Sequence, residues 1–146
     1  MLETVKATNG RILSVDFGDT RSGLAISDET RFLASGIGYI SPGGIVKTAD
    51  EVARIASKKK VSAIIVGQPI NMDGSKGPRA ARAAEFAELL RERLDIPVDM
   101  FDERMTTMAA ARYLNETNTR GKKRKGVIDT LSAQIILQNA LDLLRT

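Results

Sequence analysis

The sequence contains no cysteine, no histidine and no tryptophan, and it has only four phenylalanines and two tyrosines. The chain can therefore form no disulfide, no thiolate zinc site, no cysteine nucleophile and no Ser-His-Asp triad. What remains is carboxylate chemistry, and a metal held by such hard oxygen ligands would be magnesium or manganese. Because aromatic residues are so few, a nucleic acid would be recognised by its shape more than by stacking of its bases.

Long hydrophobic runs are also lacking. The N-terminal stretch MLETVKATNG has no apolar core of a signal peptide, and no apolar run approaches the roughly 20 residues that cross a bilayer. We therefore expect a cytoplasmic protein with no membrane partner. A chain of 146 residues, 42% of them hydrophobic and 27% charged, suffices for one buried core but not for two ordinary domains. We predict a single domain over residues 1–146.

The net charge of +4 is unevenly distributed. Five of the 22 basic residues lie in Arg120–Lys125, RGKKRK, and without them 17 basic residues stand against 18 acidic ones, a balance of −1. Such a local concentration of positive charge indicates a polyanion partner, with a solvated charge run as the alternative. A second run, Lys58–Lys60, is interpreted as favourable charge at the C-terminus of a helix.

The chain is organised around Arg11–Asp28, RILSVDFGDTRSGLAISD. This pattern predicts a buried strand that ends at Asp16, a tight turn that begins at Gly18, and a second strand at residues 23–27. A carboxylate beside buried strand residues needs a partner, which is either a divalent cation or a basic side chain such as Arg21. The alternative is that Asp16 is a structural acid that forms a salt bridge or caps the turn.

The rest of the pattern is typical of an α/β protein. We expect a weaker edge strand at residues 32–40, a helix capped by Thr48 and Glu51 that ends near Ser57, a central strand at 61–67, a helix that starts at Pro78, a strand at 98–101, a helix capped by Thr106 or Thr107, and a last helix from about Gly126 to about Leu144.

Three acids stand at comparable places in this pattern. Asp16 ends the first strand, Glu103 follows the last strand, and Asp129 lies in the first turns of the last helix. Ligands of open α/β sheets gather at the carboxyl ends of strands, so the three acids could converge there. Asp102 is the reserve candidate, because neighbouring strand residues point to opposite faces. A contact with the helix dipole would explain Asp129 without any catalytic role.

Four stretches together resemble the YqgF/RuvX family, whose members are described as Holliday junction resolvases or pre-ribosomal RNA nucleases. They follow the family's order over nearly the whole chain: VDFGDTRSGLAISD at Val15–Asp28, VGQPINMDGSKGPRA at Val66–Ala80, FDERMTT at Phe101–Thr107, and KKRKGVIDTLSAQIILQNALD at Lys122–Asp142. One departure from related nucleases is VGQP, because there the fourth strand often ends in an acid.

The resemblance implies an RNase H-like fold of the α/β class, with a mixed five-stranded sheet, an antiparallel second strand and helices on both sides. It also implies phosphodiester hydrolysis that depends on Mg²⁺ or Mn²⁺, with processing of the 5′ end of pre-16S rRNA in ribosome biogenesis as the usual assignment. Carried over by position, the catalytic and metal-binding acids are Asp16, Glu103 and Asp129.

Basic side chains would then handle phosphates. The candidates are Arg21, Arg104, Arg120, Lys122, Lys123, Arg124 and Lys125. The two isolated arginines could bind phosphate in a bidentate manner, or could instead neutralise Asp19 and Asp102. The clustered residues would make the affinity depend on salt without adding sequence specificity.

Several alternatives stay open at this point. The partner is a nucleic acid, either pre-rRNA or branched DNA, with the ribosome as a further candidate, and the chain is a monomer or a homodimer. The protein could be a Holliday junction resolvase, or a module that binds structured nucleic acid without cutting it. ATP-dependent phosphotransfer is a further rival, since DFGDTRSG resembles a phosphate loop of the actin and sugar-kinase fold, but that fold needs two such domains.

Overall fold

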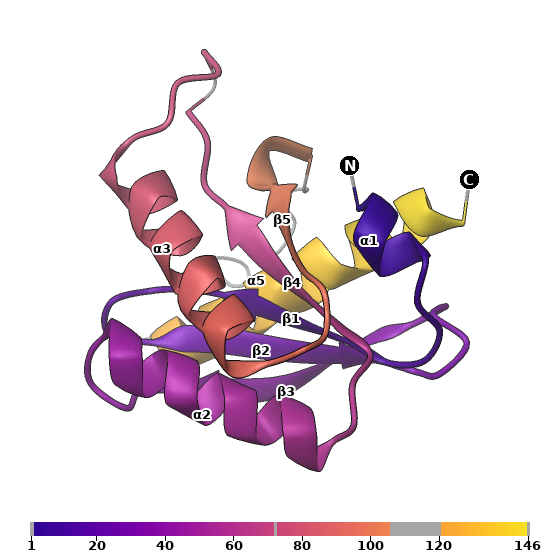
Figure 1. Ribbon diagram of the computed structural model, residues 1–146. Coiled ribbons are helices and arrows are strands. Elements are labelled where there is room, and N and C mark those ends of the chain that lie inside the picture. The colour runs from indigo at the N-terminus through magenta and orange to yellow at the C-terminus, as the bar shows by residue number, and fades with distance from the viewer. Residues whose placement is uncertain (1, 72, 106–120, 146) are drawn as a thin grey trace.

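The computed structural model describes residues 2–71, 73–105 and 121–145, which form one five-stranded sheet with helices on both faces (Figure 1). The strands are β1 (Ile12–Asp16), β2 (Ser22–Ser27), β3 (Ala34–Ile40), β4 (Ala63–Gln68) and β5 (Val98–Asp102). The helices are α1 (Glu3–Lys6), α2 (Ile45–Lys58), α3 (Pro78–Arg93), the short 3₁₀ helix η1 (Glu103–Met105) and α5 (Gly121–Leu144). Within these ranges, no helix is both long and apolar enough to cross a membrane.

The strands lie in the order β3-β2-β1-β4-β5. β2 runs antiparallel to both of its neighbours, whereas β1, β4 and β5 are parallel to one another. This confirms the predicted RNase H-like arrangement, including the antiparallel second strand and the position of β3 at the edge. Because β1, β4 and β5 are parallel, their carboxyl ends meet at one end of the sheet.

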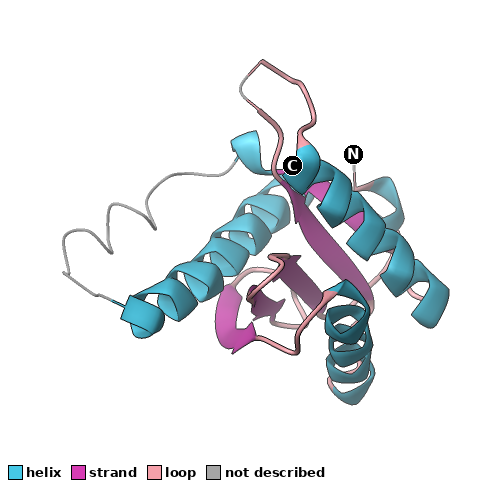
Figure 2. Ribbon diagram, turned by 90° about the vertical axis from the view of Figure 1, so that its left-hand side faces the viewer, coloured by secondary structure: helices cyan, strands magenta, loops and turns pink. Residues whose placement is uncertain are grey.

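The two faces of the sheet belong to separate cores. Leu13 and Val15 of β1 pack with α2 and α3, whereas Ile12 packs with α1 and α5 on the opposite face. Figure 2 shows the sheet between these two layers of helices. Since the side chains of a strand alternate between its faces, Asp16 follows Ile12 and Ser14 onto the α5 face.

The start of α2 differs from the prediction. The helix begins at Ile45, and Thr48 is a buried residue of its first turn whose hydroxyl donates to the carbonyl of Gly44 at 2.7 Å. Glu51 does not close a capping box but pairs with Arg54. The N-cap residue is Gly44, with a φ of 97°, and it has no side chain that could cap the helix.

The start of α5 also differs. It begins at Gly121 rather than near Gly126, so Lys122–Lys125 belong to the first turns of a helix and not to a loop. Lysine and arginine are good helix formers. Gly126 does not mark the start of the helix but allows the helix to pack closely against β3. A Cβ at that position would lie 2.4 Å from the ring of Tyr39 in β3. The helix expected after Thr106 or Thr107 falls outside the described residues.

Candidate functional site

The carboxyl end of β1 positions Asp16 beside the first turns of α5. Asp16 is opposite Gly23 in the ladder between β1 and β2. A Cβ at Gly23 would lie 1.8 Å from the carbonyl oxygen of Asp129, so only a glycine lets α5 pass this close to β2. One turn further along α5, the hydroxyl of Ser14 donates to the carbonyl of Ala133 at 2.7 Å. These two contacts hold Asp129 near Asp16.

Glu103 reaches the same face from the end of β5. Its Oε2 atom is buried, and it would lie 3.3 Å from a Cβ at Gly67 in β4. The carboxylate of Glu103 therefore uses space that any side chain at residue 67 would fill. The carboxylate thus lies beside the end of β4, where the sequence VGQP supplies no acid. The neighbouring Asp102 is instead bound by Arg104, with Nη2 2.7 Å from Oδ2.

The electrostatics indicate that the three predicted acids share one environment. Burial, followed by the charges of Glu103 and Asp129, raises the pKa of Asp16 to about 7, while Arg79 opposes the shift. Burial also raises the pKa of Glu103 and of Asp129 above their ordinary values. Carboxylates that are crowded and desolvated in this way favour either a proton or a cation.

The three carboxylates are suitable ligands for a divalent cation, but they are not grouped around a common position for one. Carboxylate oxygens are the ligands that Mg²⁺ and Mn²⁺ prefer. The pKa of Asp16 is raised by burial and then by two negative charges, which a cation would neutralise. Among the described residues, however, no group of three acids is arranged to hold one metal ion. Asp129 is engaged by Arg21, whose Nε lies 2.9 Å from Oδ2.

Of the two isolated arginines chosen from the sequence, Arg21 has a different partner from the one expected, and Arg104 has the expected partner. Arg21 pairs with Asp129 and not with Asp19. Asp19 instead accepts from Arg82 of α3 at 3.0 Å, which ties α3 to the turn after β1. Arg104 neutralises Asp102, as one of the two readings of the sequence held.

The basic segment lies at the amino end of α5, on the side where the helix passes the edge strand β3. Its members within the helix are Lys122, Lys123, Arg124 and Lys125, whereas Arg120 lies outside the described residues. Because Gly126 packs on Tyr39 of β3, the backbone of this segment continues beyond the sheet edge (Figure 2).

Two residues of the site escaped the sequence analysis. Gly67 makes room for Glu103, and the charge of Arg79 at the start of α3 partly offsets the rise in the pKa of Asp16 and Glu103. The missing acid in VGQP pointed to Gly67, but its importance could be recognised only once the position of Glu103 was known. Arg79 belongs to the stretch GPRA, and nothing in its spacing distinguishes it from the other arginines of that helix.

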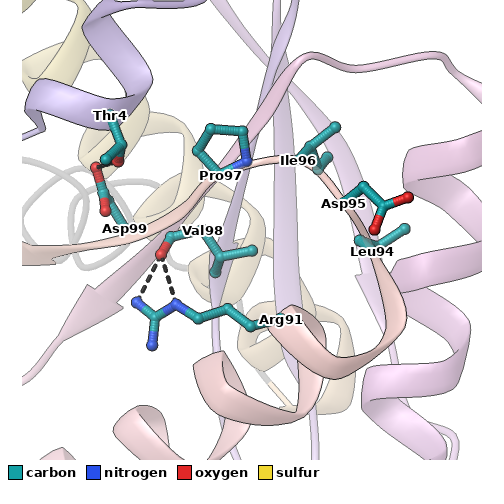
Figure 3. Close-up of a pocket in the computed structure, with 8 residues that line it drawn as sticks. All are labelled: Thr4, Arg91, Leu94, Asp95, Ile96, Pro97, Val98 and Asp99. Carbon is teal, nitrogen blue, oxygen red and sulfur yellow. Dashed lines mark hydrogen bonds between the residues drawn. The ribbon is translucent and has the colours of Figure 1, made fainter.

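A separate hollow of about 350 Å³ lies at the opposite end of the strands, between α1, the end of α3 and the start of β5 (Figure 3). Several of its polar groups form hydrogen bonds with one another. Arg91 donates twice to the carbonyl of Val98, at 3.0 and 2.6 Å, and the hydroxyl of Thr4 donates to Asp99. These contacts join α1 and α3 to β5, so the hollow lies at a packing interface between these elements.

Comparison with known proteins gives a consistent family. The sequence model of RuvX, described as "Holliday junction resolvase", matches residues 10–143. A protein of Halothermothrix orenii is 46% identical over 136 residues, which cover 90% of this chain and 94% of the relative. One of Ruminiclostridium cellulolyticum is 41% identical over 133 residues, with the same coverage. Both relatives carry the name "Putative pre-16S rRNA nuclease".

Solved structures agree on the fold. RuvC of T. thermophilus in complex with a Holliday junction substrate superposes with a TM-score of 0.58 at 13% identity, covering 92% of this chain and 94% of RuvC. The fowlpox virus Holliday junction resolvase gives a TM-score of 0.51 at 14% identity, covering 92% and 98%. At such low identity these likenesses establish an RNase H-like fold and no more.

Proposed function

This chain belongs to the RuvX family, and from that membership we propose that it is a metal-dependent nuclease that hydrolyses phosphodiester bonds at the 5′ end of pre-16S rRNA. The observation that carries the proposal is the convergence of Asp16 with Glu103 and Asp129 at the carboxyl end of β1, where burial, followed by the charges of these two acids, raises the pKa of Asp16 to about 7. Since the chain has no histidine or cysteine, neither side chain can serve as base or nucleophile in this hydrolysis.

Asp16, Glu103 and Asp129 are the residues that would hold Mg²⁺ or Mn²⁺. When bound, such an ion lowers the pKa of a water molecule and stabilises the negative charge that develops on phosphate oxygens. All three carboxylates would have to be ionised to bind the ion. The positive charge of a divalent cation would favour their ionised forms. Asp129 would exchange Arg21 for the ion, and this exchange would free the Arg21 guanidinium for a phosphate of the substrate.

The basic residues provide the remaining attraction for the RNA backbone. Charges on the first turns of α5 would contact phosphates beyond the edge of the sheet, outside the acidic cluster. The proposed contacts are made by Arg21, Arg104, Arg120, Lys122, Lys123, Arg124 and Lys125. Contacts of this kind position the substrate without reading its sequence, so the choice of cleavage site would depend on RNA shape.

Resolution of DNA junctions is the second candidate, because the matching family model carries that description. A resolvase cuts two symmetric strands and would therefore act as a homodimer, whereas trimming of an RNA end suits a monomer. Both substrates present the same phosphates to the acids, so the site itself favours neither.

The test is to incubate the protein with a labelled RNA that carries the 5′ precursor flank, and with a four-way DNA junction, in Mn²⁺, Mg²⁺ or EDTA. The proposal predicts cleavage of the RNA that requires the metal. Junction cleavage without RNA cleavage would favour the resolvase, and binding of either substrate without cleavage would indicate a non-catalytic module.

A further inference from the structure

Arg79 occupies a position where a positive charge is unfavourable for the helix. It directly follows Pro78, the first residue of α3, and the first turn of this helix contains no acidic residue. The N-terminus of a helix carries a partial positive charge, which repels cations. A residue that breaks such a local rule without a structural gain is often retained for function.

No structural partner in the described part of the chain compensates Arg79. Its side chain is exposed and forms no ion pair or hydrogen bond with a described residue. Arg82, one turn later in the same helix, differs because it pairs with both Asp19 and Glu85. Arg79 nevertheless lies at the site end of the sheet, because it lines a hollow that follows β4, the strand paired with β1. Its charge also opposes the raised pKa of Asp16 and Glu103.

The space beside Arg79 is open. A hollow of about 320 Å³ lies between the end of β4 and the start of α3, lined by Pro69, Ile70, Asn71, Gly77, Pro78 and Arg79. This hollow follows the carboxyl end of β4, which is adjacent to β1 in the sheet. Ligands of α/β sheets bind at such ends, so a substrate at Asp16 would extend into it.

We propose that Arg79 is a catalytic residue that binds the non-bridging oxygens of the phosphate cleaved at Asp16. Arg21 and Arg104 would each have to leave a carboxylate, Asp129 or Asp102, before binding a phosphate, whereas Arg79 would not. The guanidinium of Arg79 is free of described partners, and its paired N–H groups match two phosphate oxygens. This inference rests on the proposed nuclease function.

The test compares Arg79→Gln and Arg79→Lys with wild type, with Arg54→Gln as the matched control. Arg54 is also an exposed helical arginine, and it pairs only with Glu51 among the described acids. Two quantities are measured: the cleavage rate at saturating precursor RNA in Mn²⁺, and the salt dependence of RNA binding in EDTA, where nothing is cut. Melting temperatures of all variants are recorded.

We expect Arg79→Gln to cut at least tenfold more slowly at saturating RNA, Arg79→Lys to recover part of the rate, and Arg54→Gln to match wild type. The slope of log affinity against log salt should fall by about 0.7 in Arg79→Gln, the value for one lost phosphate contact with a single strand. An unchanged rate and slope in this variant would overturn the inference.

Two further outcomes separate the possible failures. A large fall in melting temperature in both Arg79 variants would make Arg79 a structural residue and would also overturn the inference. If wild type cuts neither RNA nor junction, the nuclease proposal fails on its own, while the salt slope in EDTA still decides whether Arg79 contacts phosphate.

Discussion

At Asp16, folding places a carboxyl group where ionisation is costly, since burial and two neighbouring acids raise its pKa from 3.8 to about 7. Between these two values the folded state keeps a proton that the unfolded state has already released. The contribution of Asp16 to the free energy of unfolding therefore falls as the pH rises from about 4 to about 7, and it stays low at higher pH. A cation bound beside Asp16 would stabilise its ionised form and so reduce this cost.

Asp16→Asn should remove this cost. In EDTA at pH 8 we expect the variant to be more stable than wild type, by at most about 4 kcal/mol at about 1.4 kcal/mol per pKa unit. The difference should shrink toward zero near pH 4, where the native carboxyl is protonated in the folded state. Denaturant titrations of both proteins across this range measure it. Parallel curves would mean that Asp16 ionises normally.

Gly67 tests whether the position of Glu103 matters. A Cβ at residue 67 would lie 2.7 Å from Cδ1 of Ile136 and 3.3 Å from Oε2 of Glu103. We expect Gly67→Ala to lose about 1–3 kcal/mol of stability through overpacking, and to cut RNA several-fold more slowly. Adding Ile136→Val deletes the nearer atom, so the double variant should recover stability but not activity. Recovery of both would show that Glu103 is insensitive to this contact.

At the scale of elements, the close approach of α5 to β2 brings the third acid to the site. This approach depends on Gly23, where a Cβ would lie 1.8 Å from the Asp129 carbonyl oxygen and 2.3 Å from its carbon. The obstacle is backbone, which cannot rotate away as a side chain can. α5 and β2 must therefore separate if residue 23 gains a side chain.

Gly23→Ala should consequently destabilise the fold by about 3 kcal/mol, the upper part of the usual range for overpacking, and should abolish cleavage by displacing Asp129. Gly77→Ala is the control, because a Cβ there meets only Nδ2 of Asn71, at an ordinary 3.7 Å. Urea unfolding monitored by circular dichroism compares the two. Equal stability of both variants would contradict the packing described for α5.

These elements also show what the sequence could predict. The strands followed from periodicity, because alternation is a local rule that tertiary contacts did not override. The choice of Glu103 over Asp102 came from the family motif and stays a prediction. The start of α5 was predicted wrongly, since Gly126 looks like a helix breaker until its contact with Tyr39 is known. The partner of Arg21 was likewise set by packing, because Asp129 lies 108 residues away along the chain.

At the scale of the whole molecule, the positive charge is concentrated in a segment that adjoins the acidic cluster without belonging to it. Lys122–Lys125 precede Asp129 in the same helix by about one to two turns. Under the proposed function, attraction of the nucleic acid would be separated from the chemistry performed on it. A substrate backbone would follow α5 toward the carboxyl end of β1.

Replacing Lys122, Lys123, Arg124 and Lys125 with glutamine should weaken RNA binding and flatten its salt dependence. Loss of four phosphate contacts would lower the slope of log affinity against log salt by at most about 3. The cleavage rate at saturating RNA should change little, because the acids are untouched. Fluorescence anisotropy at several salt concentrations measures the slope. A slope equal to that of wild type would show that these residues are solvated surface charges that do not contact the RNA.

The central claim is that Asp16, Glu103 and Asp129 form one metal-dependent cleavage site. It is tested most directly by the single-turnover cleavage of precursor RNA in Mn²⁺ by Asp16→Asn, Glu103→Gln and Asp129→Asn, with Asp99→Asn, at the other end of β5, as the control. The account predicts that each of the three variants stays folded, binds RNA and loses cleavage by at least about a hundredfold, whereas the control cuts normally. Wild-type cleavage by any folded variant of the three acids would contradict it.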